Sequence, residues 1–489
     1  MAKIIKENFN KILSIFILIQ PILDLLTGIC IHTFNLNITI GIFVRILFML
    51  FIVFTTVFIY KKKLPLLIST IIFIYAICYL LGIVIYKDGV LFNEIQNLVK
   101  VFYFSIVLTS LYSIKDEIRI SKMTLFITLS TYLLFILIPN LLGIGFKSYE
   151  ITKSGTLGFF NSANEISGII SILTPIVFVI IKDMKTKIIK VVFAITYLFV
   201  ILTIGTKTPL LSILITLGLT LLYYIINCIN KKTYKPIIYS IVAVMICSMG
   251  LLIVLPKTNF YKNIQVHLEF LEVDNIVEVF KDKELIDHFI FSQRLTFLEN
   301  KQKLYSESSI YQKIFGIGYT NQNEITKSIE IDYFDILYSH GIVGFIVFFG
   351  IYIYIFINIL KNRIREKNYQ TFMFKISIFL IIILSFFTGH IITAPAVSIF
   401  VAVLLLNLNK SEQKRIIFIT DNKKTKDYNN NIKFIKNSKT NLLIAILLEH
   451  NNYDYAIYDK ETDEKLARLY SEISYKYSRK NQIIKKILN

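Results

Sequence analysis

The stretch IGIFVRILFMLFIVFTTVFIY, residues 40–60, is apolar throughout except for Arg45 and two threonines, and three lysines follow it at 61–63. An α-helix rises about 1.5 Å per residue, so about 20 apolar residues are enough to cross the hydrocarbon layer of a bilayer. Lysines directly after such a block are typical of an aqueous loop at the membrane surface. The stretch therefore predicts a transmembrane helix.

Similar apolar blocks recur along the 489-residue chain, which is 55% hydrophobic and only 18% charged. A soluble domain averages about 25% charged residues, so this composition excludes a water-soluble globule. We predict an all-α polytopic membrane protein with about twelve transmembrane helices. The candidate spans are 11–32, 37–60, 64–86, 93–113, 123–144, 163–181, 189–205, 208–227, 236–255, 336–360, 371–389 and 391–408.

Lysine and arginine are distributed unevenly over the connecting segments. Segments on one side of the predicted bilayer carry 20 of these residues, whereas the short loops on the other side carry 4. Such an excess is typical of cytoplasmic segments, so we predict a multi-pass protein of the cell membrane with both termini in the cytoplasm. The net charge of +20 has the same origin, and we predict no nucleic-acid partner. The 4 cysteines lack metal-ligand spacing, so neither a metal site nor another cofactor is predicted.

The chain divides into a membrane domain and two further segments. Residues 1–255 carry the first nine predicted spans and residues 336–409 the last three. Between them, residues 256–335 form a helical extracytoplasmic loop with 13 acidic and 9 basic residues. Residues 410–489 form a cytoplasmic tail in which strand-like RIIFIT and YDYAIYD precede a charged helix at about 460–480. This pattern predicts a small α/β appendage.

Few ionisable residues fall inside the predicted spans, and each is a candidate site residue because a charge in a bilayer costs several kcal/mol. Asp24 and Arg45 lie at equal depth on adjacent spans, which permits either an ion pair or a direct role for Arg45. Lys100 either faces a polar cavity or extends its amino group to the outer surface. Together with Lys207 in an outer loop, Arg45 and Lys100 place positive charge near the outer surface, where an anionic head group would bind.

Four stretches near the predicted outer surface carry polar residues in patterns that fit a site: 155–168 (GTLGFFNSANEISG), 203–215 (TIGTKTPLLSILI), 292–305 (SQRLTFLENKQKLY) and 315–345 (FGIGYTNQNEITKSIEIDYFDILYSHGIVGF). In the first, Asn164 lies at the outer mouth of a span, while Asn161 or Ser162 caps the helix. In the second, Lys207 is at the tip of a tight hairpin.

The other two stretches place charged residues at helix ends. Arg294 heads an amphipathic helix, where it is either a site residue or a solvated one. Asp332 is predicted to cap the tenth span, with Asp335 three residues later, so that Glu330 lies just outside the helix. His340 lies inside that span beside a glycine, where it either contacts a substrate or packs between helices.

The order of these motifs resembles the O-antigen ligase and polymerase family, membrane glycosyltransferases that use sugars linked to undecaprenyl pyrophosphate. The resemblance rests on the GFFNSANE mouth, the TIGTKT turn, the Arg-headed helix SQRLTFLENK, the GIGY turn and DYFDILYSHGIVG, and it covers residues 155–350 best. It implies that Lys207 replaces an arginine that holds the pyrophosphate, that Arg294 matches the family's loop arginine, and that Glu330 replaces the family's histidine. A carboxylate can still act as a general base.

The resemblance implies a metal-independent enzyme that polymerises or ligates lipid-linked glycans on the outer face, for a capsule, an exopolysaccharide or an O-antigen-like glycan. Glu330, Arg294 and Lys207 are the expected catalytic residues. The expected partners are the undecaprenyl-pyrophosphate-linked donor, a glycan acceptor, the lipid bilayer and other polysaccharide-assembly proteins. The expected substrate-binding residues are Arg45, Lys100, Asp332, His340 and Asn164.

Two other functions also fit the chain. Twelve spans with buried charges fit a flippase for lipid-linked oligosaccharides or another polysaccharide transporter, although the charges lie shallow and the outer loop is large. A regulatory or scaffold role has only the cytoplasmic tail to support it.

Overall fold

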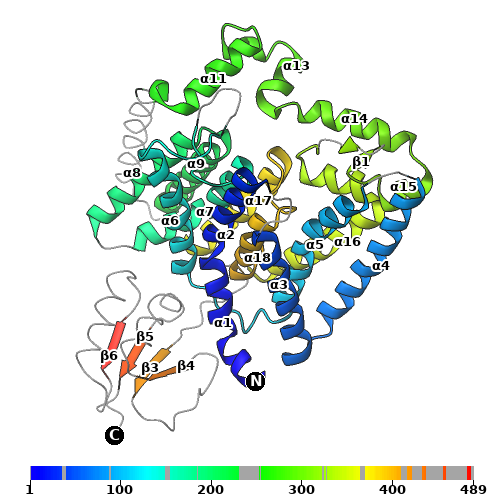
Figure 1. Cartoon of the computed structure of the whole chain (residues 1–489). Coiled ribbons are helices and arrows are strands. Elements are labelled where there is room, and N and C mark those ends of the chain that lie inside the picture. The colour runs from blue at the N-terminus through cyan, green and yellow to red at the C-terminus, as the bar shows by residue number, and fades with distance from the viewer. Residues whose placement is uncertain are drawn as a thin grey trace.

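The structure is a computed structural model that describes residues 2–35, 40–86, 90–148, 155–183, 186–230, 253, 255–321, 324–325, 328–363, 369–408, 416–420, 432–436, 455–458 and 482–485. Most of the described chain is helical (Figure 1). Almost all of the ninth predicted span, 236–255, lies outside the described residues.

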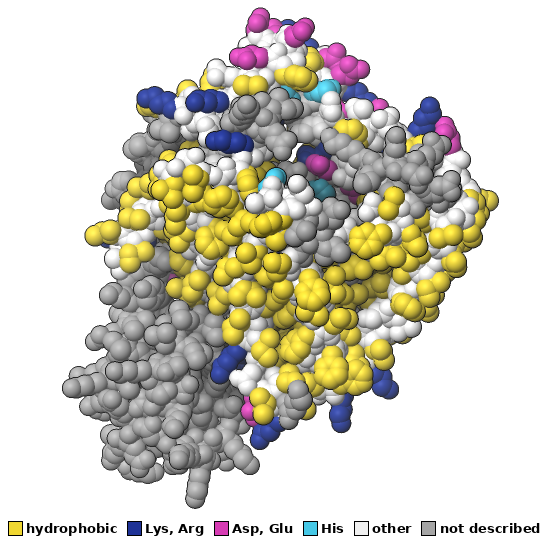
Figure 2. Space-filling model, viewed as in Figure 1, with side chains coloured by type: hydrophobic (Ala, Val, Ile, Leu, Met, Phe, Trp, Pro, Cys, Tyr) yellow, Lys and Arg dark blue, Asp and Glu magenta, His cyan; other side chains and the backbone are white. Residues whose placement is uncertain are grey.

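Nine helices in the described part of the chain are long and apolar enough to cross a membrane. Figure 2 shows their apolar side chains as a broad band across the molecule, as expected for a surface in contact with lipid. The nine are α3 with the π-helix η1 (Ile40–Phe54 and Thr55–Ile59), α4 (Leu64–Tyr86), α5 (Leu91–Ser113), α6 (Lys122–Leu141), α7 (Ala163–Asp183), α8 (Lys187–Ile204), α9 (Lys207–Asn230), α16 (Asp332–Arg363) and α17 (Tyr369–Phe387).

The first predicted span is two helices, α1 (Ala2–Leu18) and α2 (Gln20–Phe34), bent by 41°. The break lies just before Pro21, whose ring excludes the carbonyl four residues earlier and which has no N–H to donate. If the bent pair crosses the membrane as one unit, the described residues hold up to ten spans.

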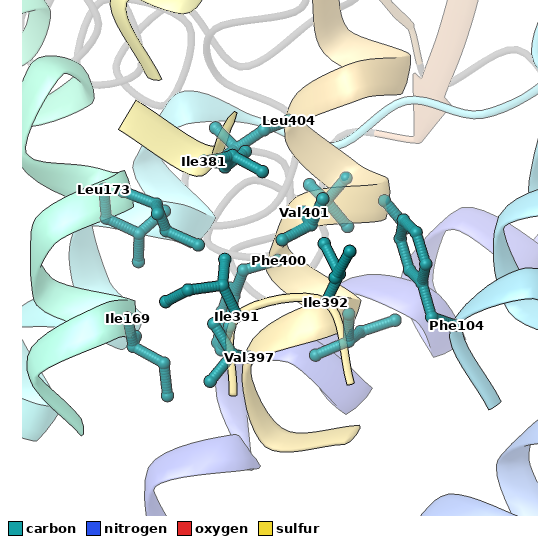
Figure 3. Packing of buried hydrophobic residues seen from close by; sticks show 14 of the residues in the cluster. Phe104, Ile169, Leu173, Ile381, Ile391, Ile392, Val397, Phe400, Val401 and Leu404 are labelled. Carbon is teal, nitrogen blue, oxygen red and sulfur yellow. The ribbon is translucent and has the colours of Figure 1, made fainter. Parts of the chain in front are cut away.

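The last predicted span is also different in the structure. Residues 391–394 form a loop, and α18 (Pro395–Leu408) has 14 residues, which is too short to cross the hydrocarbon layer at about 1.5 Å per residue. This helix packs against α5, α7 and α17, and its side chains from Val397 to Leu405 are almost completely buried (Figure 3). The sequence pattern predicted a transmembrane span here because a helix surrounded by protein is as apolar as one surrounded by lipid. The predicted count of twelve spans is therefore not confirmed.

Residues 255–331 form a separate layer of short elements at the end of the helical domain opposite the N-terminus (Figure 1). We call this end the loop end. Its elements are η2 (Leu255–Lys257), α11 (Asn259–Phe270), α12 (Ile276–Val279), α13 (Lys283–Ile286), η3 (Asp287–Phe291), α14 (Arg294–Glu307), α15 (Ile310–Phe315), β1 (Thr320–Asn321) and β2 (Glu324–Ile325).

Helix α16 is kinked at Gly341, which has φ 69° and ψ −178°. The kink leaves two carbonyls of α16 without helical N–H partners, and the turn after α15 supplies two N–H groups instead. The N–H of Ile317 donates to the carbonyl of Tyr338 at 3.0 Å, and the N–H of Gly318 donates to the carbonyl of Ser339 at 3.0 Å. A Cβ at Gly341 would lie 2.4 Å from the carbonyl oxygen of Ile314, so the close approach requires glycine. The GIGY turn is thus attached to α16.

In the tail, the two segments predicted as strands are strands β3 (Ile416–Thr420) and β5 (Tyr455–Tyr458). With β4 (Ile432–Lys436) and β6 (Gln482–Lys485) they form a parallel sheet in the order β4-β3-β5-β6. The helix expected at about 460–480 lies outside the described residues, so the α/β character of the tail stays a prediction.

Candidate functional site

A cavity of about 460 Å³ lies among α2, α3, α5, α7 and the segment that joins α17 to α18. Pockets for small molecules typically occupy about 300–1,000 Å³, so the cavity is large enough for a ligand. Figure 2 shows that the molecule is hollowed above its apolar band, with acidic, basic and histidine side chains in the hollow. The charged and histidine residues that line the cavity are Asp24, Arg45, Lys100, Glu165, Asp335 and His390.

The break between α1 and α2, just before Pro21, helps to position Arg45. It places Gln20 where its amide donates to the carbonyl of Phe16 at 2.9 Å, while Gln20 Oε1 accepts from Arg45 at 2.8 and 3.0 Å. Arg45 Nη2 also contacts Asp24 Oδ1 at 2.5 Å. The ion pair that the sequence permitted is therefore present, and both members line the cavity.

Two charged residues of the cavity come from two different helices, α5 and α7. Lys100 lies one turn after Asn97 on α5, so both residues face the cavity. Glu165 is in the first turn of α7, where its N–H bonds to the hydroxyl of Ser162 at 3.3 Å, the capping contact expected from the sequence. Lys100 thus faces a polar cavity, one of the two positions that the sequence left open.

Next to the cavity, Arg294 and Glu330 form an ion pair. Arg294 Nη2 lies 2.7 Å from Glu330 Oε2, and Nη1 donates to the carbonyl of Phe387 at 2.8 Å. Asn164 Nδ2 donates to the same carboxylate oxygen at 3.3 Å. The Arg294 side chain is 9% exposed and the Glu330 side chain 27%. Within the described residues, Glu330 Oε1 accepts no hydrogen bond, so this oxygen is available to a ligand.

The ion pair does not line the cavity, but it adjoins the cavity at two points. Asn164, which contacts Glu330, directly precedes the cavity residue Glu165 on α7. Gly389 packs against the backbone of Glu330, where an added Cβ would lie 2.4 Å from the Glu330 carbonyl oxygen. The next residue, His390, lines the cavity. The pair and the cavity are therefore neighbouring parts of one region.

Backbone strain is concentrated around this ion pair. Of the seven described non-glycine residues with positive φ, four lie here: Ser292 (54°), Gln293 (66°), Glu330 (58°) and His390 (57°). Each such conformation costs about 1 kcal/mol or more and persists only where the surrounding structure enforces it. Ser292 and Gln293 directly precede Arg294, so both members of the pair are held by strained backbone.

Asp332 holds the segment that carries His390. Its carboxylate accepts the N–H groups of His390, Ile391 and Ile392 at 2.7, 2.9 and 3.0 Å and the hydroxyl of Thr393 at 2.7 Å. The side chain is buried and does not line the cavity. Asp332 is also the first residue of α16 rather than its cap. Its contacts are those of a positioning residue.

Replacing Asp332 with asparagine is expected to destabilise the protein by about 1.5–3 kcal/mol, because one carboxylate oxygen becomes an NH₂ group that cannot accept an N–H donor. Thermal unfolding of the purified protein in detergent measures the effect. Asp274→Asn, at an exposed position of the loop, is the control. Equal midpoints for the two variants would contradict the role of Asp332.

Asp335 positions Glu330 from the other side. Its carboxylate accepts the N–H of Ile329 at 2.9 Å and the N–H of Glu330 at 2.8 Å. Lys301 Nζ lies 3.8 Å from Asp335 and donates to the hydroxyl of Ser339 at 2.6 Å. Burial lowers the pKa of Lys301, although Asp335 opposes this effect. Lys301 is a further residue of this region that the motifs did not single out; it follows Arg294 by seven residues and so lies on the same helix face.

His340 belongs to a buried aromatic and polar network. Its ring nitrogens contact the hydroxyls of Tyr75 at 3.2 Å and Tyr319 at 3.3 Å. Glu94 accepts from the hydroxyl of Tyr79 at 2.5 Å and from the N–H of Tyr319 at 2.8 Å. Tyr319 lines the cavity, but His340 is fully buried and does not. These contacts support the packing alternative for His340.

Lys207, the first residue of α9, contacts the loop rather than the cavity. Its amino group donates to the carbonyl of Phe289 and lies 4.2 Å from the centroid of that ring. It is also within electrostatic range of Arg294 and of His267 on α11. Lys207 is therefore on the Arg294 side of the region.

His267 makes the loop sensitive to acid. Partial burial first, and then the positive charges of Lys207 and His288, lower the pKa of His267 from 6.5 to about 4. Between these two values the unfolded chain binds a proton that the folded protein does not, so stability falls as the pH falls from 6.5 to 4. We expect His267→Gln to lose less stability over this range. Unfolding midpoints measured against pH would contradict this if the two profiles ran parallel.

The eight residues proposed from the sequence fall into three groups. At the ion pair lie Glu330, Arg294 and Asn164. The cavity is lined by Arg45 and Lys100. The other three residues lie neither at the ion pair nor on the cavity wall; they are Lys207, Asp332 and His340. Within the described residues, no three His, Cys, Asp or Glu side chains gather so that they could hold a metal ion.

A family model matches most of the chain. A sequence profile of the family described as O-antigen ligase like membrane protein matches residues 6–285 and 276–411. The two matches cover the helical domain, the ion pair and the cavity. A search of curated proteins gave no match. The chain therefore belongs to the family of O-antigen ligase-like membrane proteins.

Proposed function

We propose that the protein is a membrane glycosyltransferase that polymerises or ligates glycans carried on undecaprenyl pyrophosphate. The observation that carries this proposal is the Arg294–Glu330 ion pair beside a polar cavity near the loop end. A glycosyl transfer of this kind needs a base for the acceptor hydroxyl and a cation for the departing pyrophosphate. The ion pair offers both groups next to each other.

In the proposed reaction, the acceptor hydroxyl oxygen bonds to the anomeric carbon of the donor sugar. The bond from this carbon to the pyrophosphate oxygen breaks, and its electron pair leaves with undecaprenyl pyrophosphate. The hydroxyl proton passes to Glu330, whose Oε1 is available among the described contacts. Arg294 and Lys207 stabilise the charge on the leaving pyrophosphate, for which Lys207 must exchange the carbonyl of Phe289 for the ligand.

The four protein groups around Glu330 fit this role. Arg294 and Asn164 hold one carboxylate oxygen, while Asp335 fixes the backbone N–H of Glu330. The other carboxylate oxygen of Glu330, Oε1, is thereby held in position, and it accepts no hydrogen bond from the described residues. Asp332 fixes the adjoining segment at His390 in the same way.

The proposal places the loop end on the outer face of the cell membrane, with both termini in the cytoplasm. The uneven distribution of lysine and arginine in the sequence supports this orientation. In Figure 2, basic side chains lie along the lower edge of the apolar band, and at the loop end basic and acidic side chains lie together. The polymer would then belong to a capsule, an exopolysaccharide or an O-antigen-like glycan.

Purified protein in detergent tests the enzyme against the transporter. Lipid-linked repeat units, extracted from a strain that lacks the protein, should be joined into longer chains without any sealed vesicle. A transporter moves its substrate between compartments and makes no new glycosidic bond. Intact repeat units after incubation with folded, monodisperse protein would contradict the proposal.

A further inference from the structure

The cavity is lined by an acid and a base that have no hydrogen-bond partner among the described residues. Lys100 and Glu165 both line it, and each lies within electrostatic range of the other. Within the described residues, neither the amino group of Lys100 nor the carboxylate of Glu165 has a hydrogen-bond partner in the protein. Polar groups in such sheltered positions normally have partners, so these two are available to a ligand.

The remaining charges of the cavity are already neutralised. Arg45 is held by Asp24 at 2.5 Å, and the other oxygen of Asp24 accepts from Tyr132 at 2.5 Å. Asp335 lies 3.8 Å from Lys301. The cavity thus carries charges of both signs but no excess of positive charge.

This balance argues against a pyrophosphate in the cavity. A ligand with two or more negative charges would lie close to Glu165 and Asp335 as well as to Lys100, and the like charges would repel it. On the neighbouring side, Arg294 is paired with Glu330, but Lys207 has no ion-pair partner among the described residues, so that side carries an excess of positive charge. The anionic part of the substrate fits there.

The cavity fits a group that donates and accepts hydrogen bonds at the same time. A sugar hydroxyl can donate to Glu165 and accept from Lys100 without separating the two charges. Neutral side chains suited to further hydroxyls also line the cavity, including Asn97, Asn161 and Thr393. The volume of about 460 Å³ is in the range of small-molecule sites.

We infer that the cavity is a saccharide subsite that takes an uncharged, hydroxyl-rich sugar of the lipid-linked glycan, with Lys100 and Glu165 as its paired contacts. This inference rests on the proposed function, because it divides one substrate between two places. The sugar occupies the cavity, and the pyrophosphate lies outside it near Arg294 and Lys207. Glu330, between the two, faces the bond that is broken.

Two lipid probes test this division by direct binding, which needs no turnover. One is bare undecaprenyl pyrophosphate, and the other is the same lipid with the repeat unit extracted from a strain that lacks the protein. We expect the sugar to tighten binding to the wild type by about tenfold. Lys100→Met and Glu165→Gln should each reduce that gain to about twofold or less, because each removes one contact of the same hydroxyl groups. Neither should change the Kd of the bare lipid by more than about twofold.

If the cavity instead binds an anion, the two substitutions should change the Kd of the bare lipid in opposite directions. Glu165→Gln would tighten binding of the bare lipid by removing a repulsive charge, and Lys100→Met would weaken it. That result would overturn the inference, as would an unchanged sugar gain in both variants. The exposed ion pair Lys283–Glu299 on the loop supplies matched controls, Lys283→Met and Glu299→Gln. Elution of every variant as a monodisperse protein excludes misfolding.

The outcome also separates this inference from the proposed function. In one outcome, the wild type joins no repeat units, the repeat unit still tightens binding of the lipid, and both variants lose this effect. That outcome contradicts the proposed function and supports the subsite. If the wild type transfers sugar and the repeat unit tightens lipid binding to both variants as much as to the wild type, the subsite is contradicted and the proposed enzyme activity is supported.

Discussion

Glu330→Gln is expected to lower the rate of glycosyl transfer by about 10²–10⁴-fold, the usual contribution of a positioned general base. Glutamine has nearly the same shape but cannot take up the proton of the acceptor hydroxyl. The fold around it should persist, because Asp335 holds the backbone N–H of residue 330 rather than its side chain. Initial rates with purified protein and lipid-linked repeat units measure the effect.

Glu299→Gln is the matched control for this experiment. Glu299 lies in the same loop, on α14, and its side chain is 63% exposed in an ion pair with Lys283. Exposed ion pairs of this kind contribute about 0–1 kcal/mol, so the control should keep its activity. A Glu330→Gln protein that transfers sugar as fast as this control would remove Glu330 from the reaction.

Arg294→Ala is expected to lower transfer by about 10²–10³-fold, comparable with the loss of one group that stabilises developing charge in a transition state. The substitution also removes the donor to the carbonyl of Phe387 and leaves Glu330 with Asn164 as its side-chain donor. Because the account places the pyrophosphate at Arg294, the loss should appear both in the KM for the lipid-linked donor and in kcat. Steady-state kinetics with purified protein separates the two.

Arg294→Lys distinguishes charge from geometry. Lysine keeps the positive charge but cannot reach Glu330 and the Phe387 carbonyl with two nitrogens of one planar group. We expect it to recover only a small part of the activity. Lys283→Ala, on the exposed loop surface, is the control for removing a cation. Full activity in Arg294→Ala with unchanged donor KM would contradict the site.

Local patterns in the sequence predicted several parts of this region. Helix α14 begins at Arg294 and Glu330 lies just outside α16, as expected, although Asp332 is the first residue of α16 rather than its predicted cap. These boundaries depend on short-range signals that a single chain displays. The ion pair of Asp24 with Arg45 was one of two alternatives, because equal depth in adjacent spans is also readable from sequence.

Other parts depend on contacts between distant segments, which no local pattern contains. Lys301 lies in the helix predicted from the sequence, but its burial against Ser339 and Asp335 depends on segments far along the chain. The kink at Gly341 exists because the turn at Ile317 supplies hydrogen bonds to α16. Helix α18 resembled a span because hydropathy does not distinguish protein from lipid as the surrounding medium.

The central claim is that one substrate is divided between the ion pair and the cavity. A structure of the Glu330→Gln protein with bound lipid-linked repeat unit tests it most directly. The account predicts density for the pyrophosphate beside Arg294 and Lys207, with the first sugar between Lys100 and Glu165. Pyrophosphate density between Lys100 and Glu165, or lipid-linked glycan bound away from both places, would contradict it.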